Sequence, residues 1–300
     1  MKALVVVEDG RFAPRDMAGP QAAPGQLLVR VKASAISPRD LRLARQKSGF
    51  RPGADFAGIV EQAAGRHGPQ TGDRVAGVIP NGAWSEQIAV SPRSVSPIPD
   101  GMDFAEAAAI AATGLTALYA LERAGGLIGR RVLVTAAGGG VGRLACLIAA
   151  AGGARVTGWV RSDAAAAPLA ACGIPVIAGE TVAAARAAGP FDAIIDMAGG
   201  ETLAIAAGML AAGGRCVVVG NASGAPTVID AAELYMNRRE LCGFALFPEL
   251  ETKPAAEGLP RLFALWEKGA VTVPDISPVD AMAFSDPAGL PPGKCVLVFD

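Results

Sequence analysis

The first hundred residues contain short apolar runs that are separated by turns rich in glycine and proline. The runs are KALVVV, QLLVRVKA, FAGIVEQA, DRVAGVI and WSEQIAV. Runs of this length between turn residues are typical of β-strands joined by hairpins and short loops. The pattern therefore predicts a compact, mostly antiparallel β-domain.

Beyond residue 100, strand-like and helix-like segments alternate. Residues 103–125 are rich in alanine and leucine and predict a long helix packed on a core. Six apolar β-runs follow, with helical stretches between them: RRVLVTA, ARVTGWV, IPVIAG, FDAIID, RCVVVG and ELCGFALF. This alternation predicts a parallel, doubly wound sheet, and the continuous apolar runs suit strands that are buried on both faces.

The C-terminal residues return to the first pattern. Residues 258–271 predict an amphipathic helix, and the run GKCVLVFD predicts a closing strand that folds back onto the N-terminal β-domain. A length of 300 residues also favours two domains over one. We therefore predict an α/β protein with one domain from residues 1–100 and 249–300 and another from residues 101–248.

Composition narrows the class of protein. Lys+Arg 27 and Asp+Glu 28 give a net charge of -1, which provides no basic surface for nucleic acid or anionic lipid. The N-terminal apolar run is too short for a signal peptide, and no uninterrupted apolar run reaches about 18 residues. We expect a cytoplasmic protein that binds neither nucleic acid nor membrane.

The cysteines and the single histidine do not suggest a metal site. No two cysteines have the CxxC spacing, and each falls inside an apolar pattern, so we expect buried thiols in a reducing compartment. His67 lies in the turn GRHGPQ and is expected to be a solvated loop residue. The cysteines are Cys146, Cys172, Cys216, Cys242 and Cys295.

A glycine-rich turn joins the first strand of the second domain to the next helix. Ala137, Gly139 and Gly142 occupy the three positions of a G-x-G-x-x-G turn, with alanine in place of the first glycine. The second position lets the backbone approach a pyrophosphate, the third lets helix and strand pack closely, and the helix N–H groups at Gly140 and Val141 attract negative charge. Because the turn lies in a βαβ unit, it predicts a dinucleotide site. The alternative is a turn that only connects two elements.

The second strand of that unit ends in GWVRSD. Dinucleotide sites that take NAD normally place Asp or Glu at this strand end, on the ribose hydroxyls, whereas this chain has Val160 followed by Arg161 and Ser162. A guanidinium and a hydroxyl suit a 2′-phosphate, which a carboxylate would repel. The stretch therefore predicts NADP(H). The alternative is that Arg161 is a solvated surface residue and Ser162 only the N-cap of the next helix.

The chain resembles the medium-chain dehydrogenase/reductase superfamily, in its zinc-independent quinone oxidoreductase and enoyl reductase branch. The resemblance covers nearly the whole length and depends on the order and spacing of these segments: AISPRDL, GADFAGIV, TGDRVAG, GAWSEQIAV, AATGLTALYAL, TAAGGGVG, VVVGNASGAP and GKCVLV. It implies a GroES-like β-domain, a Rossmann domain and a cleft between them for nicotinamide and substrate.

The resemblance also implies which residues bind the cofactor. Thr113 would lie near the nicotinamide ribose, and Gly139, Gly140 and Val141 would hold the pyrophosphate. Arg161 and Ser162 would hold the 2′-phosphate. The residues that would line the nicotinamide are Met197, Ala198, Gly220 and Asn221.

Zinc-dependent members of the superfamily carry metal ligands that this chain lacks. They have cysteine at the position of Pro38, a His-Glu pair at the positions of Ala54 and Asp55, and a four-cysteine structural lobe. Zinc needs a tetrahedral set of nitrogen or sulfur ligands, and no such set is visible here. We expect no catalytic or structural metal.

The segment AISPRDLR departs from its branch in two places. Ser37 stands where Asn is usual, and Arg42 stands where Tyr is frequent, while Asp40 is retained. Ser37, Arg42 and Asn81 are the candidate donors to a substrate carbonyl, and Asp40 either holds the loop or transfers a proton. Tyr119 and Tyr235 are expected to be packing residues, so neither replaces a catalytic tyrosine.

The sequence therefore favours an NADPH-dependent reductase of an α,β-unsaturated carbonyl or quinone, free or carrier-bound. The altered AISPRDLR segment and shortened loops keep open a second hypothesis, an NADP(H)-binding protein with a recognition role or a non-redox reaction. Metal-free oxidation of a secondary alcohol is the least favoured, because no histidine or Tyr-Lys base is visible. The resemblance also implies a homodimer through the edge strand near LCGFALF, since a bare apolar edge invites association.

Overall fold

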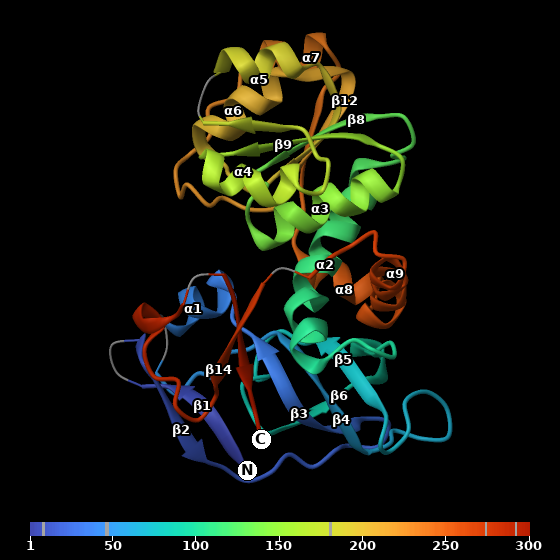
Figure 1. Ribbon diagram of the computed structural model, residues 1–300, viewed down its shortest axis with the longest axis vertical. Coiled ribbons are helices and arrows are strands. Elements are labelled where there is room, and N and C mark those ends of the chain that lie inside the picture. The colour runs from blue at the N-terminus through green and yellow to red at the C-terminus, as the bar shows by residue number, and fades with distance from the viewer. Residues whose placement is uncertain (8–9, 46–47, 180–181, 274, 292) are drawn as a thin grey trace. The chain divides into compact units, whose positions relative to one another are not determined.

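The computed structural model describes residues 1–7, 10–45, 48–179, 182–273, 275–291 and 293–300. These residues form two compact units (Figure 1). Unit 1 contains Met1–Leu115, Leu250–Glu267 and Val273–Asp300, and unit 2 contains Thr116–Glu249 and Lys268–Thr272. The domain limits given above, at residues 100 and 248, stay a prediction.

Unit 1 is a β-domain, as its alternating runs predict. Within the described residues, β1 and β2 form an antiparallel pair, and a larger sheet of seven strands has the order β14-β15-β3-β4-β5-β7, with β6 also paired to β3. The strands are β1 (Lys2–Val6), β2 (Phe12–Asp16), β3 (Leu27–Ala35), β4 (Asp55–Gln62), β5 (Arg74–Val78), β6 (Gln87–Val90), β7 (Val95–Pro97), β14 (Ile276–Asp280) and β15 (Lys294–Val298). The predicted return of GKCVLVFD to this domain is confirmed, because β15 pairs antiparallel with β3.

Aromatic side chains fill one end of the unit 1 core. Phe12 contacts Trp84 at 5.1 Å and Phe284 at 5.1 Å between ring centroids, and Trp84 meets Phe284 edge-on at 5.9 Å. These rings come from β2, from the turn before β6 and from the segment after β14. They join the first and last thirds of unit 1 into one hydrophobic cluster.

Helices complete unit 1. The helix predicted over residues 103–125 is confirmed as α2, whose residues to Leu115 belong to unit 1 and from Thr116 onward to unit 2, whereas the short α1 was not predicted. The helical elements with residues in unit 1 are α1 (Pro38–Ala44), α2 (Phe104–Ala124), α8 (Leu246–Thr252), α9 (Ala255–Glu267), and the 3-10 turns η2 (Pro92–Ser94) and η3 (Pro287–Gly289).

Unit 2 is a Rossmann fold. Its parallel sheet has the order β10-β9-β8-β11-β12-β13 within the described part of the chain. The strands are β8 (Arg131–Thr135), β9 (Arg155–Val160), β10 (Val176–Ala178), β11 (Phe191–Asp196), β12 (Leu210–Val218) and β13 (Glu240–Gly243). The order reverses between β8 and β11, and in such sheets ligands bind at the carboxyl ends beside that reversal.

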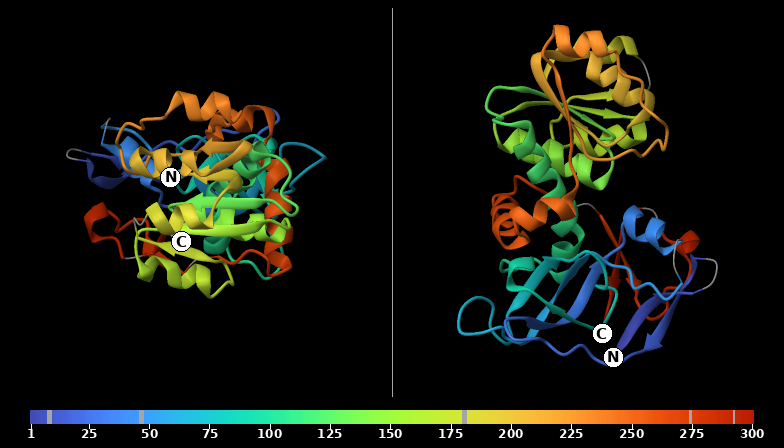
Figure 2. Two further views of the ribbon diagram at one scale, coloured as in Figure 1. Left: turned by 90° about the horizontal axis from the view of Figure 1, so that it is seen from above. Right: turned by 180° about the vertical axis from the view of Figure 1, so that it is seen from behind.

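Helices cover both faces of this sheet (Figures 1 and 2). Helices α3 and α4 lie on one face, and α5, α6 and α7 lie on the other. The helices are α3 (Gly140–Ala151), α4 (Asp163–Ala170), α5 (Val182–Ala188), α6 (Gly200–Gly208) and α7 (Ala231–Met236). The predicted doubly wound, parallel sheet is therefore confirmed.

Three details of the sequence predictions are wrong or only partly right. The run ELCGFALF is a strand only to Gly243, after which the chain enters α8. Tyr235 is 71% exposed and is not a packing residue, while Tyr119 is buried as expected. Cys172 is exposed and Cys242 is only partly buried, whereas Cys146, Cys216 and Cys295 are buried. His67 lies in an exposed bend, as predicted.

One helix bears on the expectation about membrane spans. Helix α2, which the sequence predicts as a long core helix, is long and apolar enough, by length and composition, to cross a membrane, although Glu106 and Glu122 interrupt its apolar run. In its most apolar window, 67% of the residues are buried inside the protein. A core helix satisfies the same criterion, because burial in protein and burial in lipid select the same residues.

Candidate functional site

Gly139 lies in the glycine turn between β8 and α3, and the packing of the fold does not require a glycine at this position. Gly139 has φ -80° and ψ 166°, an extended conformation that any residue adopts. A Cβ on Gly139 would meet only the carbonyl oxygen of Ala136, at 3.4 Å. No side chain caps the first turn of α3, and that turn holds no acidic residue. The exposed turn therefore fits a pyrophosphate, which needs close backbone approach and unsatisfied N–H groups.

Gly142 has the opposite character, because the fold requires it. A Cβ there would lie 2.6 Å from the carbonyl oxygen of Ala136 and 2.7 Å from the Cα of Ala137. Ala136 itself has φ 46°, a left-handed conformation that is strained for alanine and turns its carbonyl toward the helix. The same Cβ would lie 3.0 Å from the Cε atom of Met197, so the turn also packs against the end of β11.

Arg161 and Ser162 lie where β9 ends and α4 begins, as the sequence predicts. Both are exposed, and within the described residues neither side chain has a hydrogen bond or ion pair. Ser162 occupies the N-cap position, with φ -151° and ψ 159°, but its hydroxyl makes no capping bond. Capping therefore does not engage this hydroxyl, and both donor groups face solvent.

Four residues predicted to line the nicotinamide follow β11 and β12 and lie in adjacent loops. The backbone N–H of Ala222 donates to the carbonyl of Met197 at 3.0 Å, and that of Ser223 donates to the carbonyl of Ala198 at 2.9 Å. Gly199 has φ 68°, and a Cβ on it would overlap the side chain of Asn221 at 2.1 Å. The structure thus brings together Met197, Ala198, Gly220 and Asn221.

Sequence reasoning missed the buried network that holds these loops. Asp196, at the end of β11, accepts a hydrogen bond from the Thr135 hydroxyl at 2.6 Å and another from the Gly199 N–H at 2.9 Å. The Thr135 oxygen accepts from the N–H groups of Met197 at 3.1 Å and Ala198 at 3.4 Å. Burial raises the pKa of Asp196, while the bond from Thr135 opposes that shift. The available signal was the acidic residue that ends the run FDAIID, directly after the apolar residues AII.

In unit 1, Ser37 and Asp40 form a capping box at the start of α1. The Ser37 hydroxyl donates to the Asp40 carboxylate at 2.5 Å, and the backbone N–H of Ser37 donates to the same oxygen at 3.1 Å. The other carboxylate oxygen accepts from the Gly53 N–H at 3.3 Å, and Arg39 lies 3.9 Å away. Burial raises the pKa of Asp40, and the Ser37 bond opposes this. These contacts favour the loop-holding role for Asp40 over proton transfer.

Arg42 and Asn81 are the more accessible of the predicted donors. Both side chains are exposed, and neither has a partner among the residues that the structure describes. Arg39 donates from Nη1 to the carbonyl of Pro80 at 2.9 Å, which joins α1 to the turn that carries Asn81. The structure therefore brings the predicted catalytic residues into one region of unit 1, with the Ser37 proton engaged by Asp40.

Thr113 belongs to unit 1, unlike the other predicted cofactor residues. Its hydroxyl donates to the carbonyl of Ala109 at 2.9 Å, within α2. One residue earlier, the N–H of Ala112 donates to the carboxylate of Asp55. Asp55 is fully buried, and burial raises its pKa to about 6, although the ammonium of Lys294 opposes the shift. Sequence reasoning noted Asp55 only for its place in the zinc comparison.

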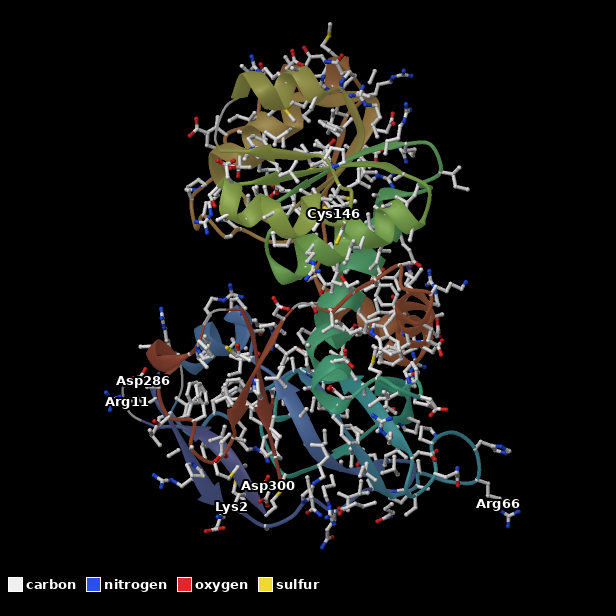
Figure 3. All side chains as sticks on the ribbon, viewed as in Figure 1. Lys2, Arg11, Arg66, Cys146, Asp286 and Asp300 are labelled. Carbon is white, nitrogen blue, oxygen red and sulfur yellow. The ribbon has the colours of Figure 1, made fainter. Side chains whose placement is uncertain are left out.

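A pocket of about 1040 Å³ also opens in unit 1, and Leu41 of α1 is one of the residues that line it. Arg11, Arg15 and Arg45 line it, together with Asp286, which lies 3.8 Å from Arg11 at the surface (Figure 3). None of the predicted catalytic or cofactor residues lines this pocket. Its location therefore does not mark the candidate site.

Pro38 and Ala54 occupy positions where zinc-dependent enzymes have ligands, and neither side chain can bind a metal. In the described portion of the chain, no group of three or more His, Cys, Asp or Glu side chains is placed to hold a metal ion. The absence of a metal stays a prediction.

Comparisons with known families agree with the two units. The model of the alcohol dehydrogenase GroES-like domain matches residues 23–100, and the model of zinc-binding dehydrogenase matches residues 140–259. The chain belongs to the medium-chain dehydrogenase/reductase superfamily. Members of this superfamily bind a nicotinamide cofactor on the Rossmann domain, which is the role that the Gly139 turn fits.

Curated relatives of this superfamily member are larger proteins. A mycocerosic acid synthase-like polyketide synthase of Mycobacterium tuberculosis is 34% identical over 134 residues, which are 42% of this chain and 6% of that protein. The trans-enoyl reductase resD of Aspergillus sclerotiorum is 37% identical over 131 residues, or 39% of this chain and 36% of that protein. The chain thus matches well under half the length of these relatives.

Solved structures match over the full length. An alcohol dehydrogenase superfamily protein from Novosphingobium aromaticivorans is 26% identical with a TM-score of 0.86, and the match covers 100% of both chains. A quinone oxidoreductase from Pseudomonas syringae pv. tomato is 25% identical with a TM-score of 0.84, covering 99% of each chain. The quinone oxidoreductase structure and the trans-enoyl reductase resD are consistent with the zinc-independent branch of the superfamily.

Proposed function

We propose that the chain is a zinc-independent, NADPH-dependent reductase of α,β-unsaturated carbonyl compounds or quinones. The observation that carries the cofactor assignment is the end of β9, where Val160 stands in place of the usual carboxylate and is followed by the exposed, unpaired side chains of Arg161 and Ser162. Support for reductase activity comes from relatives named as enoyl reductases and quinone oxidoreductases. Pro38 and Ala54 support a reaction that does not use zinc.

The chain's own residues account for binding. Gly139, Gly140 and Val141 would receive the pyrophosphate at the N-terminus of α3, and Arg161 with Ser162 would receive the 2′-phosphate. The loop of Met197 and Ala198 and the loop of Gly220 and Asn221 would line the nicotinamide, and Thr113 its ribose. When bound, the nicotinamide supplies a hydride to the β-carbon of the acceptor.

Donors in unit 1 would then stabilise the charge that grows on the substrate carbonyl oxygen. Arg42 and Asn81 carry exposed N–H groups without protein partners in the described residues, so they can meet that oxygen without breaking an existing bond. The Ser37 hydroxyl can donate to the substrate oxygen only after its hydrogen bond to the Asp40 carboxylate breaks. We propose that the proton for the α-carbon comes from solvent.

The reaction itself is tested with NADPH that carries deuterium at C4. We expect NADPH oxidation with small enones or 1,4-quinones, and deuterium on the β-carbon of a reduced enone by mass spectrometry. Binding of NADPH without reduction of any acceptor in a broad panel would favour the second hypothesis, a cofactor-binding protein without turnover. The engagement of Ser37 by Asp40 is the observation that keeps this hypothesis open.

Arg161→Ala tests the cofactor choice. We expect weaker NADPH binding by about 1–3 kcal/mol, the scale of a charge-assisted hydrogen bond, and almost unchanged NADH binding. Calorimetric titration with each cofactor measures both values. Equal losses for NADPH and NADH would show that Arg161 does not contact the 2′-phosphate.

We further propose a second copy of the chain as partner and a cytoplasmic location. Support for the dimer comes from β13, which is the last strand of its sheet. Exposed apolar side chains precede it, with Val228 at 85%, Tyr235 at 71% and Met236 at 73% exposure. Carrier-bound substrates are proposed because polyketide synthases are among the relatives.

A further inference from the structure

The carboxylate of Asp55 is buried in unit 1, and the function proposed above gives it no role. Its side chain is 1% exposed at the start of β4. Its hydrogen bond within the described residues comes from the backbone N–H of Ala112, in the middle of α2. A buried charge is costly, and a helix does not need a carboxylate at a mid-helix N–H. This contact therefore calls for a reason other than stability.

The contact fixes the helical turn that carries Thr113. Ala112 is held by Asp55, the Thr113 hydroxyl donates to Ala109, and Gly114 packs so closely on α9 that a Cβ would lie 2.3 Å from Leu262. All of these contacts lie within unit 1. Because the Thr113 hydroxyl gives its proton to Ala109, its oxygen lone pairs remain to accept from a sugar hydroxyl.

Some groups around Asp55 favour its ionised form and others disfavour it. Lys294 from β15 and Arg39 from α1 favour the ionised form, whereas burial and Asp40 from α1 disfavour it. Ser34 from β3 contributes a hydroxyl that donates to the backbone carbonyl of Asp55 and not to its carboxylate. Lys294 is itself anchored through Nζ to the carbonyl of Ile36 at 3.5 Å.

We propose that Asp55 is a positioning residue that acts through Ala112 to place Thr113 against the nicotinamide ribose. The inference rests on the proposed function, because it requires that a nicotinamide nucleotide binds at Thr113. Lys294 supports the position by favouring the carboxylate form. A purely structural carboxylate would instead serve the stability of unit 1 alone.

Asp55→Asn tests this role, because the amide keeps an acceptor for Ala112 and removes the charge. We expect the Kd for NADPH, measured by fluorescence titration, to rise about fivefold, the difference between a charge-assisted and a neutral hydrogen bond. Thr113→Val is expected to raise the same Kd. If Asp55 acts through Thr113, the double variant binds as weakly as Thr113→Val alone. Independent, multiplying losses would overturn the proposal.

The Tm of Asp55→Asn at two pH values distinguishes the positioning role from a purely structural role. The pKa of Asp55 is about 6 in the folded chain, above its ordinary 3.8, so the folded state gains stability when Asp55 is protonated. That gain is complete below pH 3.8 and is lost as the pH rises through 6. We therefore expect Asp55→Asn to match the wild type in Tm at pH 4 and to equal or exceed it at pH 8. A lower Tm at pH 8 would mean a structural role.

Ser34→Ala is the matched control. It removes a buried hydrogen bond to Asp55 but leaves the carboxylate and Ala112 untouched. We expect a lower Tm with an unchanged Kd for NADPH. A wild-type protein that does not bind NADPH would refute the proposed function, whereas a wild type that binds NADPH equally well after Asp55→Asn would refute only this inference.

Discussion

Gly142→Ala is expected to destabilise unit 2 and to remove dinucleotide binding. The added Cβ would lie 2.6 Å from the Ala136 carbonyl oxygen and 2.7 Å from the Ala137 Cα, and backbone atoms cannot swing aside as a side chain can. Forced overpacking of this kind costs about 2–3 kcal/mol. The helix start would move away from β8, and the N–H groups that face the pyrophosphate would move with it. Denaturant unfolding and NADPH titration measure the two losses.

Gly139→Ala is the control that separates a packing glycine from a ligand glycine. Its Cβ would meet one protein atom at 3.4 Å, which is ordinary contact, in a backbone conformation that alanine adopts freely. We expect unchanged unfolding and a clear loss of NADPH affinity, because the new methyl group stands in the path of the pyrophosphate. NADPH affinity that survives Gly139→Ala would place the pyrophosphate elsewhere.

Asp196→Ala is expected to lower the free energy of unfolding of unit 2 by about 3 kcal/mol, because it leaves buried donors without acceptors. The variant removes the acceptor of the Thr135 hydroxyl and of the Gly199 N–H. The loop of Met197 and Ala198 then loses its anchor, so NADPH affinity should fall as well. Hydrogen exchange followed by mass spectrometry locates the loss, which should centre on residues 196–200.

Thr135 offers a matched pair for the same network. Thr135→Ser keeps the hydroxyl, whereas Thr135→Val keeps the shape and removes it. We expect the valine variant to reproduce most of the Asp196→Ala loss and the serine variant to stay near the wild type, since the hydroxyl alone bonds both Asp196 and the N–H groups of the loop. Equal stability of the valine and serine variants would show that the network contributes little.

Most of the fold could be predicted, because buried strands and helices have recognisable patterns of apolar residues in the sequence. The runs RVLVT and FDAIID each contain consecutive apolar residues, VLV and AII, because both faces of their sheet are covered. The turn at Gly139 and Gly142 needs small residues, which the sequence shows directly. The end of ELCGFALF could not be placed, because an apolar run looks the same in a strand and in the start of a buried helix. The burial of Tyr235 was predicted wrongly for a related reason. A residue in an apolar stretch of sequence does not necessarily pack against another part of the folded chain.

The polar networks could not be predicted from spacing. Thr135 and Asp196 are 61 positions apart, and Asp55 and Ala112 are 57 apart, so only the folded chain brings each pair together. A backbone N–H as partner leaves no mark on the sequence at all. Asp40 was easier to interpret, because its partner Ser37 lies three residues away in a capping box.

Unit 1 consists of segments that lie before and after residues 116–249 of unit 2 in the sequence, and this order has a consequence for synthesis on the ribosome. Residues 116–249 emerge as one stretch, so most of unit 2 can fold while the nascent chain still lacks β14 and β15. Until β15 arrives, the Ala33–Ala35 end of β3 has an open edge where its last partner will pair. A nascent chain stalled before residue 294 would therefore contain the residues of unit 2 and a unit 1 sheet with one unpaired strand edge, the kind of edge that chaperones protect.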